Sequence, residues 1–193
     1  MVSIMMTAPK SKVPVTEQDQ QKPYFKYYHE PLTPAPPEKY GQVLKGPVNP
    51  ATALKIHDRN RLFEPGYLEC ENGYCVMPDG TGFVANLTNM PGVTAEMFDW
   101  WFAWHALDNL RYTIWDNEDH YAAESMQKLR AQNPMLSNRE KYWDTTHFVL
   151  EDLGFGPGPL YINFKHPRDL GFYVDKIGTK ACATIVCAKG FGK

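Results

Sequence analysis

The sequence predicts an α+β fold in which several antiparallel strands grip one or two helices. Three observations lead to this prediction: a long aromatic helix expected from about Ala95 to about Leu110, a β-branched and apolar run at 145–153, and several short strand-like segments separated by turns. At 193 residues, the chain is long enough to bury a core without disulfide bonds.

The first part of the chain differs from the rest in composition. Residues 1–49 are rich in Pro, Lys, Gln and Glu, and they predict an extended, partly disordered arm with disorder at its tip, followed by a domain at 50–193. However, residues 24–28 hold four aromatic side chains in five positions. This cluster is too apolar for a free tail, so we expect it to dock on the domain or on a second subunit.

A small antiparallel sheet is expected before the aromatic helix. A short helix is plausible at 50–60, and strands are expected at 67–71 and 74–77, joined by Asn72-Gly73, a frequent signature of a tight hairpin. A turn at 78–82 leads into a third strand at 83–87.

The aromatic helix has clear start signals. Pro91-Gly92 interrupts the preceding segment, Thr94 is a suitable N-cap, and Glu96 places a carboxylate in the first turn. Its apolar residues go nearly all the way round, which favours a helix buried between layers. After it, residues 110–115 alternate like a short strand, and residues 121–132 have the composition of a helix that ends before Asn133-Pro134.

The run at 145–153 is the best strand in the sequence. With a two-residue period, His147, Val149 and Glu151 share one face. Three further strands are expected at 160–164, 171–174 and 181–188.

Composition argues against several classes of partner. The net charge is −2 and the basic residues are scattered, so neither nucleic acid nor a membrane surface is predicted as a partner. No apolar run reaches about 18 residues, and we expect a cytoplasmic protein. Cys70-x4-Cys75 and Cys182-x4-Cys187 are spaced more widely than usual zinc motifs, which favours buried or free thiols.

Metal-binding chemistry requires histidines and carboxylates on one face of a rigid element. The pair His147 and Glu151 qualifies, and so does His120, although any single histidine is more often packed in a core or solvated. We expect His105 to be buried and hydrogen-bonded beneath the tryptophans. His29, His57 and His166 lie in polar or proline-rich surroundings and are expected to be solvated. The residues alone therefore indicate an α+β domain with an aromatic pocket.

A family resemblance adds to this picture. The segments that carry it are residues 99–105, Leu110-Arg111-Tyr112, the cluster at 115–120, and the stretches at 69–75, 78–82, 90–94 and 146–152. In these segments the sequence resembles the diacetylphloroglucinol hydrolase and phloretin hydrolase family.

The resemblance implies a START-like helix-grip fold with an N-terminal extension used in dimerisation, and so a homodimer. It also implies hydrolysis of the carbon–carbon bond between a phenolic ring and an acyl group, with zinc held by two His and two Glu. The matching ligands are His120 and Glu151, 31 residues apart. Tyr112 matches a tyrosine that handles the phenolic substrate, where it would orient a phenol oxygen or relay a proton. Trp101, Trp104 and Trp115 are expected to stack the flat substrate.

The sequence departs from the family in its second ligand pair. The family places an H-x-x-x-E motif in a C-terminal helix, and no segment of these 193 residues corresponds to it. We interpret the chain as a family member lacking this C-terminal part; an incomplete site, or His147 or His105 as a substitute ligand, are the alternatives. The rival function is a non-catalytic helix-grip protein that binds aromatic ligands, or an inactive fragment that needs a partner chain.

Overall fold

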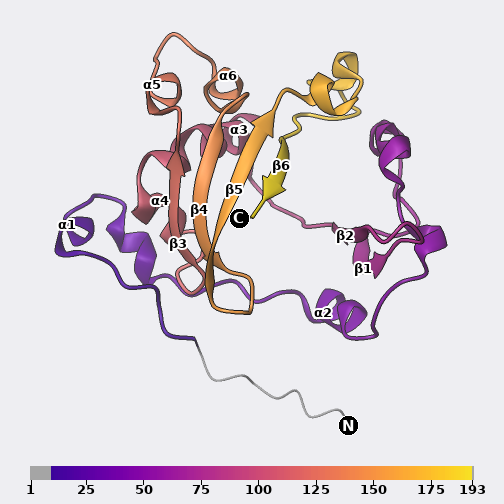
Figure 1. The fold of residues 1–193 in the computed structure, drawn as a ribbon, viewed down its shortest axis with the longest axis horizontal. Helices are drawn as coiled ribbons and strands as arrows, with labels where there is room; N and C mark the ends of the chain where they lie inside the picture. Colours follow the sequence, from indigo (N-terminus) through magenta and orange to yellow (C-terminus); the bar gives the residue numbers. More distant parts are fainter. Residues whose placement is uncertain (1–9, 193) are drawn as a thin grey trace. The chain divides into compact units, whose positions relative to one another are not determined.

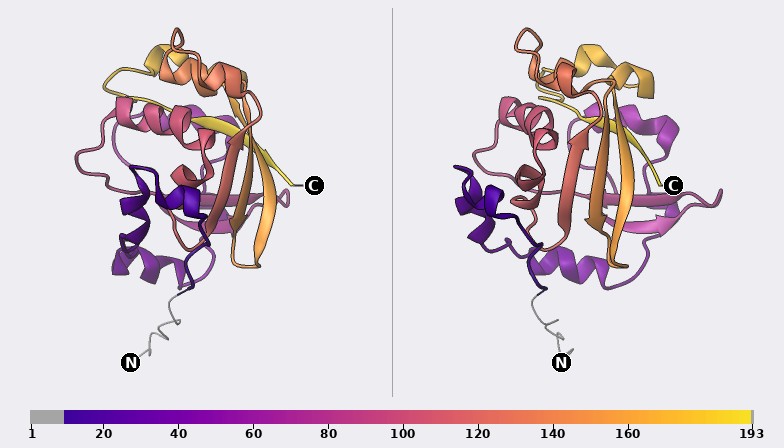
Figure 2. Two further views of the ribbon diagram at one scale, coloured as in Figure 1. Left: turned by 90° about the vertical axis from the view of Figure 1, so that its left-hand side faces the viewer. Right: turned by 60° about the vertical axis from the view of Figure 1, so that its left-hand side comes forward.

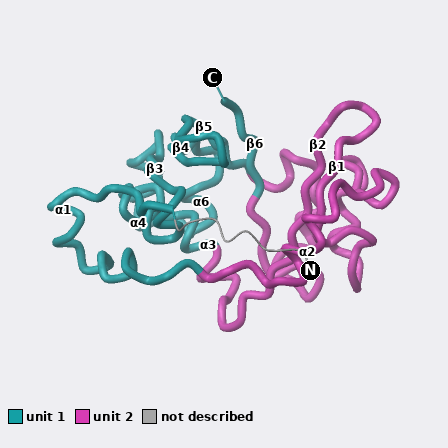
Figure 3. The backbone as a smooth tube through the Cα atoms, turned by 90° about the horizontal axis from the view of Figure 1, so that it is seen from below, with its two compact units in different colours: residues 1–32, 99–165, 187–193 teal, residues 33–98, 166–186 magenta. Residues whose placement is uncertain are grey.

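The computed structural model describes residues 10–192. These residues divide into two compact units, shown in two colours in Figure 3. Unit 1 comprises the described parts of residues 1–32, 99–165 and 187–193, and unit 2 comprises residues 33–98 and 166–186. The predicted disorder at the tip of the arm lies outside the described residues, and the predicted boundary between residues 49 and 50 stays a prediction.

Unit 1 is built on a four-stranded antiparallel sheet with the order β3-β4-β5-β6 (Figure 1). Its strands are β3 (His120–Ser125), β4 (Thr146–Asp152), β5 (Pro157–Lys165) and β6 (Cys187–Phe191). The antiparallel sheet and the accompanying helices confirm the α+β class. β4 also confirms the strand expected at 145–153.

The core of unit 1 lies between one face of this sheet and the helices that cover it (Figure 2). Val149 of β4 and Ala123 of β3 are register partners, and they pack with Ala106 and Tyr112 from the helical segment. The two-residue period therefore directs Val149 inward together with His147, as the sequence predicted.

The aromatic helix is shorter than expected. α3 (Ala95–Trp104) begins with the Thr94 hydroxyl accepting a hydrogen bond from the Met97 amide at 3.2 Å, which confirms the predicted N-cap. It is followed by the 3-10 turn η4 (His105–Leu107) and by α4 (Asn109–Thr113). α3 is not buried all round, because Met97 and Trp100 are exposed.

Two predictions for the segments after α3 were wrong. Residues 110–115 do not form a strand, since the Asp108 carboxylate caps α4 by accepting from the Leu110 amide at 3.0 Å. Residues 121–132 are not one helix: they give β3 and then α5 (Lys128–Ala131). Pairing with β4 outweighs the helical propensity of β3, because it buries Ala123 and Ser125. α6 (Asn138–Tyr142) completes this part of unit 1.

The predicted arm contains short helices. In unit 1 these are α1 (Glu17–Gln20), which begins with a capping box between Thr16 and Asp19, and the 3-10 helix η1 (Phe25–His29). In unit 2 the arm continues into α2 (Pro37–Val43).

Unit 2 contains one hairpin of β1 (Asn72–Val76) and β2 (Gly82–Asn86) together with 3-10 helices. Asn72-Gly73 is not the turn of this hairpin, contrary to the prediction, because it lies within β1 and the chain reverses at 77–81. Gly73 has φ +156°, and a Cβ there would lie 2.6 Å from Cγ1 of Val48. The glycine is therefore needed for the close approach of residue 48 to β1.

Unit 2 also contains the 3-10 helices η2 (Pro50–Thr52), η3 (Ile56–Phe63), η5 (Pro167–Leu170) and η6 (Val174–Lys176). In place of the single short helix expected at 50–60, the chain forms the two 3-10 segments η2 and η3. No strand forms at 67–71 or at 171–174, so these two predictions were wrong. The strand expected at 181–188 begins only at Cys187. Within residues 10–192, no helix has both the length and the apolar character needed to span a membrane.

Candidate functional site

The backbone of unit 1 brings His120 and Glu151 side by side. His120 begins β3, Glu151 lies near the end of β4, and the two are register partners in the antiparallel pair. A short loop joins this end of β3 to α4, which carries Tyr112. A short stretch of sheet and one helix turn therefore place three of the predicted site residues together.

The three side chains contact one another. Nε2 of His120 lies 3.9 Å from Oε2 of Glu151. The Tyr112 ring stacks on the His120 imidazole, with centroids 4.0 Å apart and planes 7° from parallel. The Tyr112 hydroxyl donates a hydrogen bond to the same Oε2 of Glu151. One carboxylate oxygen is thus shared between a phenol donor and an imidazole.

Burial shifts the protonation of these groups. Burial, and then the hydrogen bond to Glu151, hold the pKa of Tyr112 above its ordinary value, so the phenol keeps its proton at neutral pH. Burial lowers the pKa of His120, against the opposing effect of the carboxylates of Asp116 and Glu151.

Of the three predicted substrate-binding tryptophans, Trp115 adjoins this cluster and Trp101 packs against Trp115. The Trp115 ring lies 5.0 Å from that of His120, and Trp101 meets Trp115 edge to face at 5.4 Å. Trp115 is exposed, so part of its indole surface is accessible. Trp115 therefore provides aromatic surface next to Tyr112 and His120, and Trp101 supports it.

Trp104 has different neighbours. Its ring stacks on Trp100 at 4.8 Å, Tyr24 meets it edge to face at 5.5 Å, and the Arg111 guanidinium lies over it at 4.5 Å. It contacts Trp101 at 5.7 Å. These contacts connect the N-terminal segment to α3 and α4, and a substrate role for Trp104 stays a prediction.

Two buried histidines, His105 and His147, lie side by side, and His105 also contacts Trp101. His105 is buried, stacks on Trp101 at 5.4 Å, and its Nδ1 lies 2.9 Å from the Trp101 carbonyl oxygen, as the sequence predicted. Its ring is 5.2 Å from that of His147. Burial lowers the pKa of His105 to about 4 and that of His147 to about 3, so both imidazoles are neutral at neutral pH.

His120 and Glu151 offer one imidazole nitrogen and one carboxylate as donor atoms for a metal. A neutral imidazole and a carboxylate are suitable zinc ligands. Throughout residues 10–192, no group of three His, Cys, Asp or Glu side chains is arranged to hold a metal. The pair therefore fits part of a zinc site, and the metal roles of both residues stay predictions.

Asp116 and Asn117, which precede His120, were not among the predicted site residues. The Asp116 carboxylate accepts hydrogen bonds from the amides of Glu118 and Asp119, both at 3.1 Å, and its carbonyl accepts from the His120 amide at 3.1 Å. The side chain of Asn117 is buried. The polar run at 116–119 was the available signal, because Asp and Asn before a strand often form such local turns.

Comparison with known proteins supplies the family. The sequence model of the DAPG hydrolase PhiG domain matches residues 54–192. Phloretin hydrolase of Eubacterium ramulus is 41% identical over 187 residues, which is 96% of this chain and 68% of that protein. The 2,4-diacetylphloroglucinol hydrolases of Pseudomonas protegens and of a Pseudomonas species are each 33% identical over 156 residues. These matches cover 80% of this chain and 50% and 53% of the two enzymes, so the chain spans about half their length.

Proposed function

Because this chain belongs to the DAPG hydrolase PhiG domain family, we propose that it hydrolyses the carbon–carbon bond between a phenolic ring and an acyl group. The names of its relatives support a phenolic ketone of the acylphloroglucinol or phloretin type as substrate. The observation that carries the proposal is the convergence of Tyr112, His120 and Glu151 next to exposed indole surface.

The indoles would bind the flat part of such a substrate. Trp115 offers an exposed face, and Trp101 holds it in an edge-to-face contact at 5.4 Å. An aromatic ring stacked there gains contact area and excludes water from the adjoining polar groups. The phenolic ring would then lie beside Tyr112 and His120.

Hydrolysis of this bond adds the oxygen of water to the acyl carbon and places a hydrogen on the ring carbon. The acyl group leaves as a carboxylic acid, and the electron-rich ring takes the electron pair of the broken bond together with a proton. Tyr112 is suited to orient a phenol oxygen or to relay this proton, because its hydroxyl is protonated and already donates to Glu151. Glu151 in turn is the acceptor that fixes the direction of this hydroxyl.

We also propose zinc as the cofactor, with Nε2 of His120 and the carboxylate of Glu151 as two of its ligands. Zinc, when bound, would lower the pKa of water to near neutrality. The support for it is the nature of the two donors and their 3.9 Å separation. A cytoplasmic homodimer stays a prediction of the sequence.

The test is product formation from phloretin and from 2,4-diacetylphloroglucinol, followed by chromatography with and without added zinc. We expect Y112F and E151Q to lower the rate by about a hundredfold or more, which is typical for loss of a proton-transfer group. Y161F is the matched control, since the Tyr161 ring packs against Phe148 and Phe191 in the same unit. No product from either ketone with zinc supplied, or variants as active as Y161F, would contradict the proposal.

A second function, binding of an aromatic ligand without chemistry, is favoured by one observation: the exposed indole of Trp115 and its edge-to-face contact with Trp101. In that case phloretin would quench the tryptophan fluorescence while no product forms. Quenching together with product formation would support the hydrolase instead.

A further inference from the structure

We propose that Asn117 is a positioning residue: it ties the N-terminal clamp, defined here as residues 10–30, to the site loop, defined as residues 115–119, and so fixes Trp115 and His120. This inference rests on the proposed function of the site, because Asn117 does not touch the reacting groups and would act on them through Trp115 and His120. Clamp and site loop both lie in unit 1.

Asn117 is the centre of this attachment. Its side chain is 2% exposed, and its Nδ2 donates to the carbonyl oxygens of Tyr28 at 2.8 Å and Glu30 at 3.0 Å. Its own carbonyl accepts a hydrogen bond from the Val13 amide at 2.8 Å. The residue therefore binds two separate parts of the clamp, and both contacts of its side chain require an NH2 donor.

The clamp is itself held in one shape. The Tyr28 hydroxyl donates to the Val13 carbonyl at 2.7 Å, which joins its two ends, and Val13 is buried. Nζ of Lys12 donates to the same Tyr28 carbonyl that Asn117 uses, at 2.8 Å. The Tyr28 carbonyl thus accepts hydrogen bonds from both Lys12 and Asn117.

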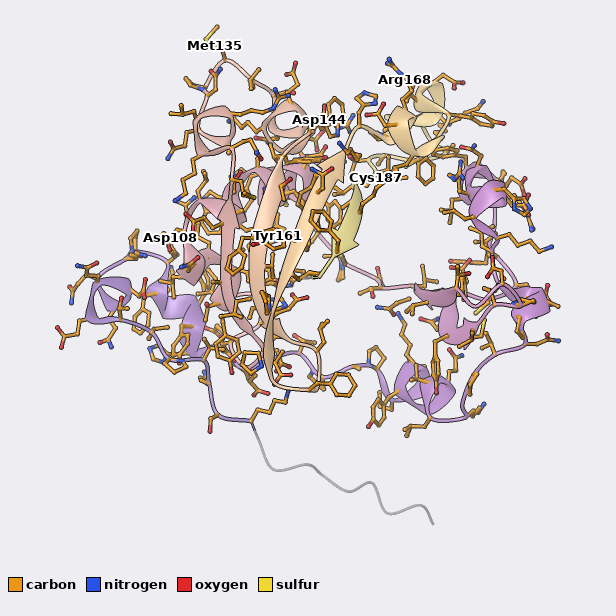
Figure 4. The ribbon with its side chains drawn as sticks, viewed as in Figure 1. Asp108, Met135, Asp144, Tyr161, Arg168 and Cys187 are labelled. Atoms are coloured by element: carbon orange, nitrogen blue, oxygen red, sulfur yellow. The ribbon has the colours of Figure 1, made fainter. Side chains whose placement is uncertain are left out.

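Two ion pairs also connect the clamp to the site loop and to the start of α4. Lys10 pairs with Asp119 of the site loop at 2.5 Å, and the Asp119 carbonyl accepts from the Asp152 amide of β4 at 2.9 Å. Lys22 pairs with Asp108 at 2.6 Å, and Asp108, labelled in Figure 4, caps the helix that carries Tyr112. The clamp therefore contacts both ends of the segment from α4 to β3.

The site loop contains Trp115 and directly precedes His120, so its position sets the positions of both residues. The loop begins with Trp115, and the Asp116 carbonyl accepts the His120 amide at 3.1 Å. A loop free to move would carry the indole and the backbone of His120 with it. Held by Asn117, the loop keeps His120 stacked on Tyr112 and within 3.9 Å of Glu151.

The sharpest test is N117D in the full 193-residue chain, with N109D as the matched control. Aspartate has the shape of asparagine, but it places an acceptor oxygen against the two carbonyl groups of the clamp. Asn109 is exposed at the start of α4, where the same change adds the same charge at a tolerated position. Circular dichroism establishes that each variant is folded at the temperature of measurement.

We expect N117D to speed the amide hydrogen exchange of residues 116–119 by about tenfold or more, because buried carbonyl groups lose their donor. The imidazole NMR resonance of His120, assigned by its absence in H120Q, should shift in N117D and keep its position in N109D. The kcat per folded molecule should fall about tenfold in N117D alone.

These outcomes separate positioning from simple stabilisation. If N117D lowers only the melting temperature, while the exchange of the site loop and the His120 resonance match those of N109D, the inference is overturned. If the wild type cleaves no phenolic ketone, the proposed function fails, and exchange and NMR still decide the role of Asn117. Should N117D not fold, N117A replaces it: it removes both hydrogen bonds of the side chain without adding a charge, and unchanged exchange of the site loop there also overturns the inference.

Discussion

The two units differ in what they bury. Among residues 10–192, every polar or charged side chain that is buried lies in unit 1: Asp99, His105, Thr113, Asn117, Ser125, Thr145 and His147. The buried side chains of unit 2 are small or apolar, as with Ala53, Phe63 and Cys70, and its surface carries exposed Ile56 and Tyr67. Buried polar groups must be hydrogen-bonded, so unit 1 specifies its side-chain positions far more tightly.

This difference can be measured because all five tryptophans lie in unit 1, at positions 100, 101, 104, 115 and 143. Tryptophan fluorescence therefore reports the unfolding of unit 1. Substitutions in unit 2 of matching chemistry serve as controls, and the comparison predicts that they leave the fluorescence transition nearly unchanged.

The largest loss of stability should come from lowering the pH. Burial holds the pKa of His105 at about 4 and that of His147 at about 3, below the ordinary 6.5, so the unfolded chain binds protons that the folded one does not. The contribution of these two imidazoles to the free energy of unfolding is fully present above pH 6.5. It falls as the pH drops toward their folded-state pKa values, by about 1.4 kcal/mol per pH unit for each imidazole. For the pair this amounts to about 4 kcal/mol between pH 7 and pH 5.

Urea unfolding at both pH values measures this loss. H147Q should reduce it by about half. H57Q, which replaces an imidazole 71% exposed in unit 2, is the control. Equal losses in H147Q and the wild type would show that burial of His147 is not the cause.

The next effect concerns a buried carboxylate of unit 1. Asp99 accepts from Nε of Arg139 at 2.8 Å and from the hydroxyl of Tyr142, a fully buried side chain, at 2.9 Å. D99A should lower the free energy of unfolding by about 3 kcal/mol, since both donors lose this acceptor. In unit 2, D79A removes an exposed carboxylate from a turn and should not move the fluorescence transition. A similar shift in both variants would contradict the comparison.

A smaller effect is expected from an apolar truncation. Val149 is 1% exposed in the core of unit 1, and V149A should destabilise by about 2 kcal/mol through lost burial and the resulting cavity. Val84 of unit 2 is 80% exposed, so V84A should leave urea unfolding unchanged. The comparison would fail if V84A had the larger effect.

The smallest effect concerns a helix cap. The Ser137 hydroxyl and the Glu140 carboxylate form a capping box at the start of α6. S137A should cost about 1 kcal/mol, whereas S137T keeps a hydroxyl and should restore most of the stability. Equal urea midpoints for S137A and S137T would show that the cap contributes little.

The elements predicted well from sequence have strong local signals. Thr94 begins α3 because its hydroxyl caps the first turn, and β4 forms where β-branched and apolar residues alternate. Predictions failed where distant contacts decide. Residues 120–125 have helical composition but pair with β4, and Asn72-Gly73 lies inside a strand because Val48 packs against Gly73. Local propensity differences are small beside the free energy of sheet pairing and close packing.

The sequence by itself determined the family, the α+β class and the residue types of the site, because these follow from motifs and short-range patterns. Only the tertiary structure decided that His120 and Glu151 are register partners, that the Tyr112 hydroxyl donates to Glu151, and that Asn117 holds the site loop through the clamp. Strand register and buried hydrogen bonds join residues far apart in the chain. Such contacts are specified by the packing of the whole unit and not by local sequence.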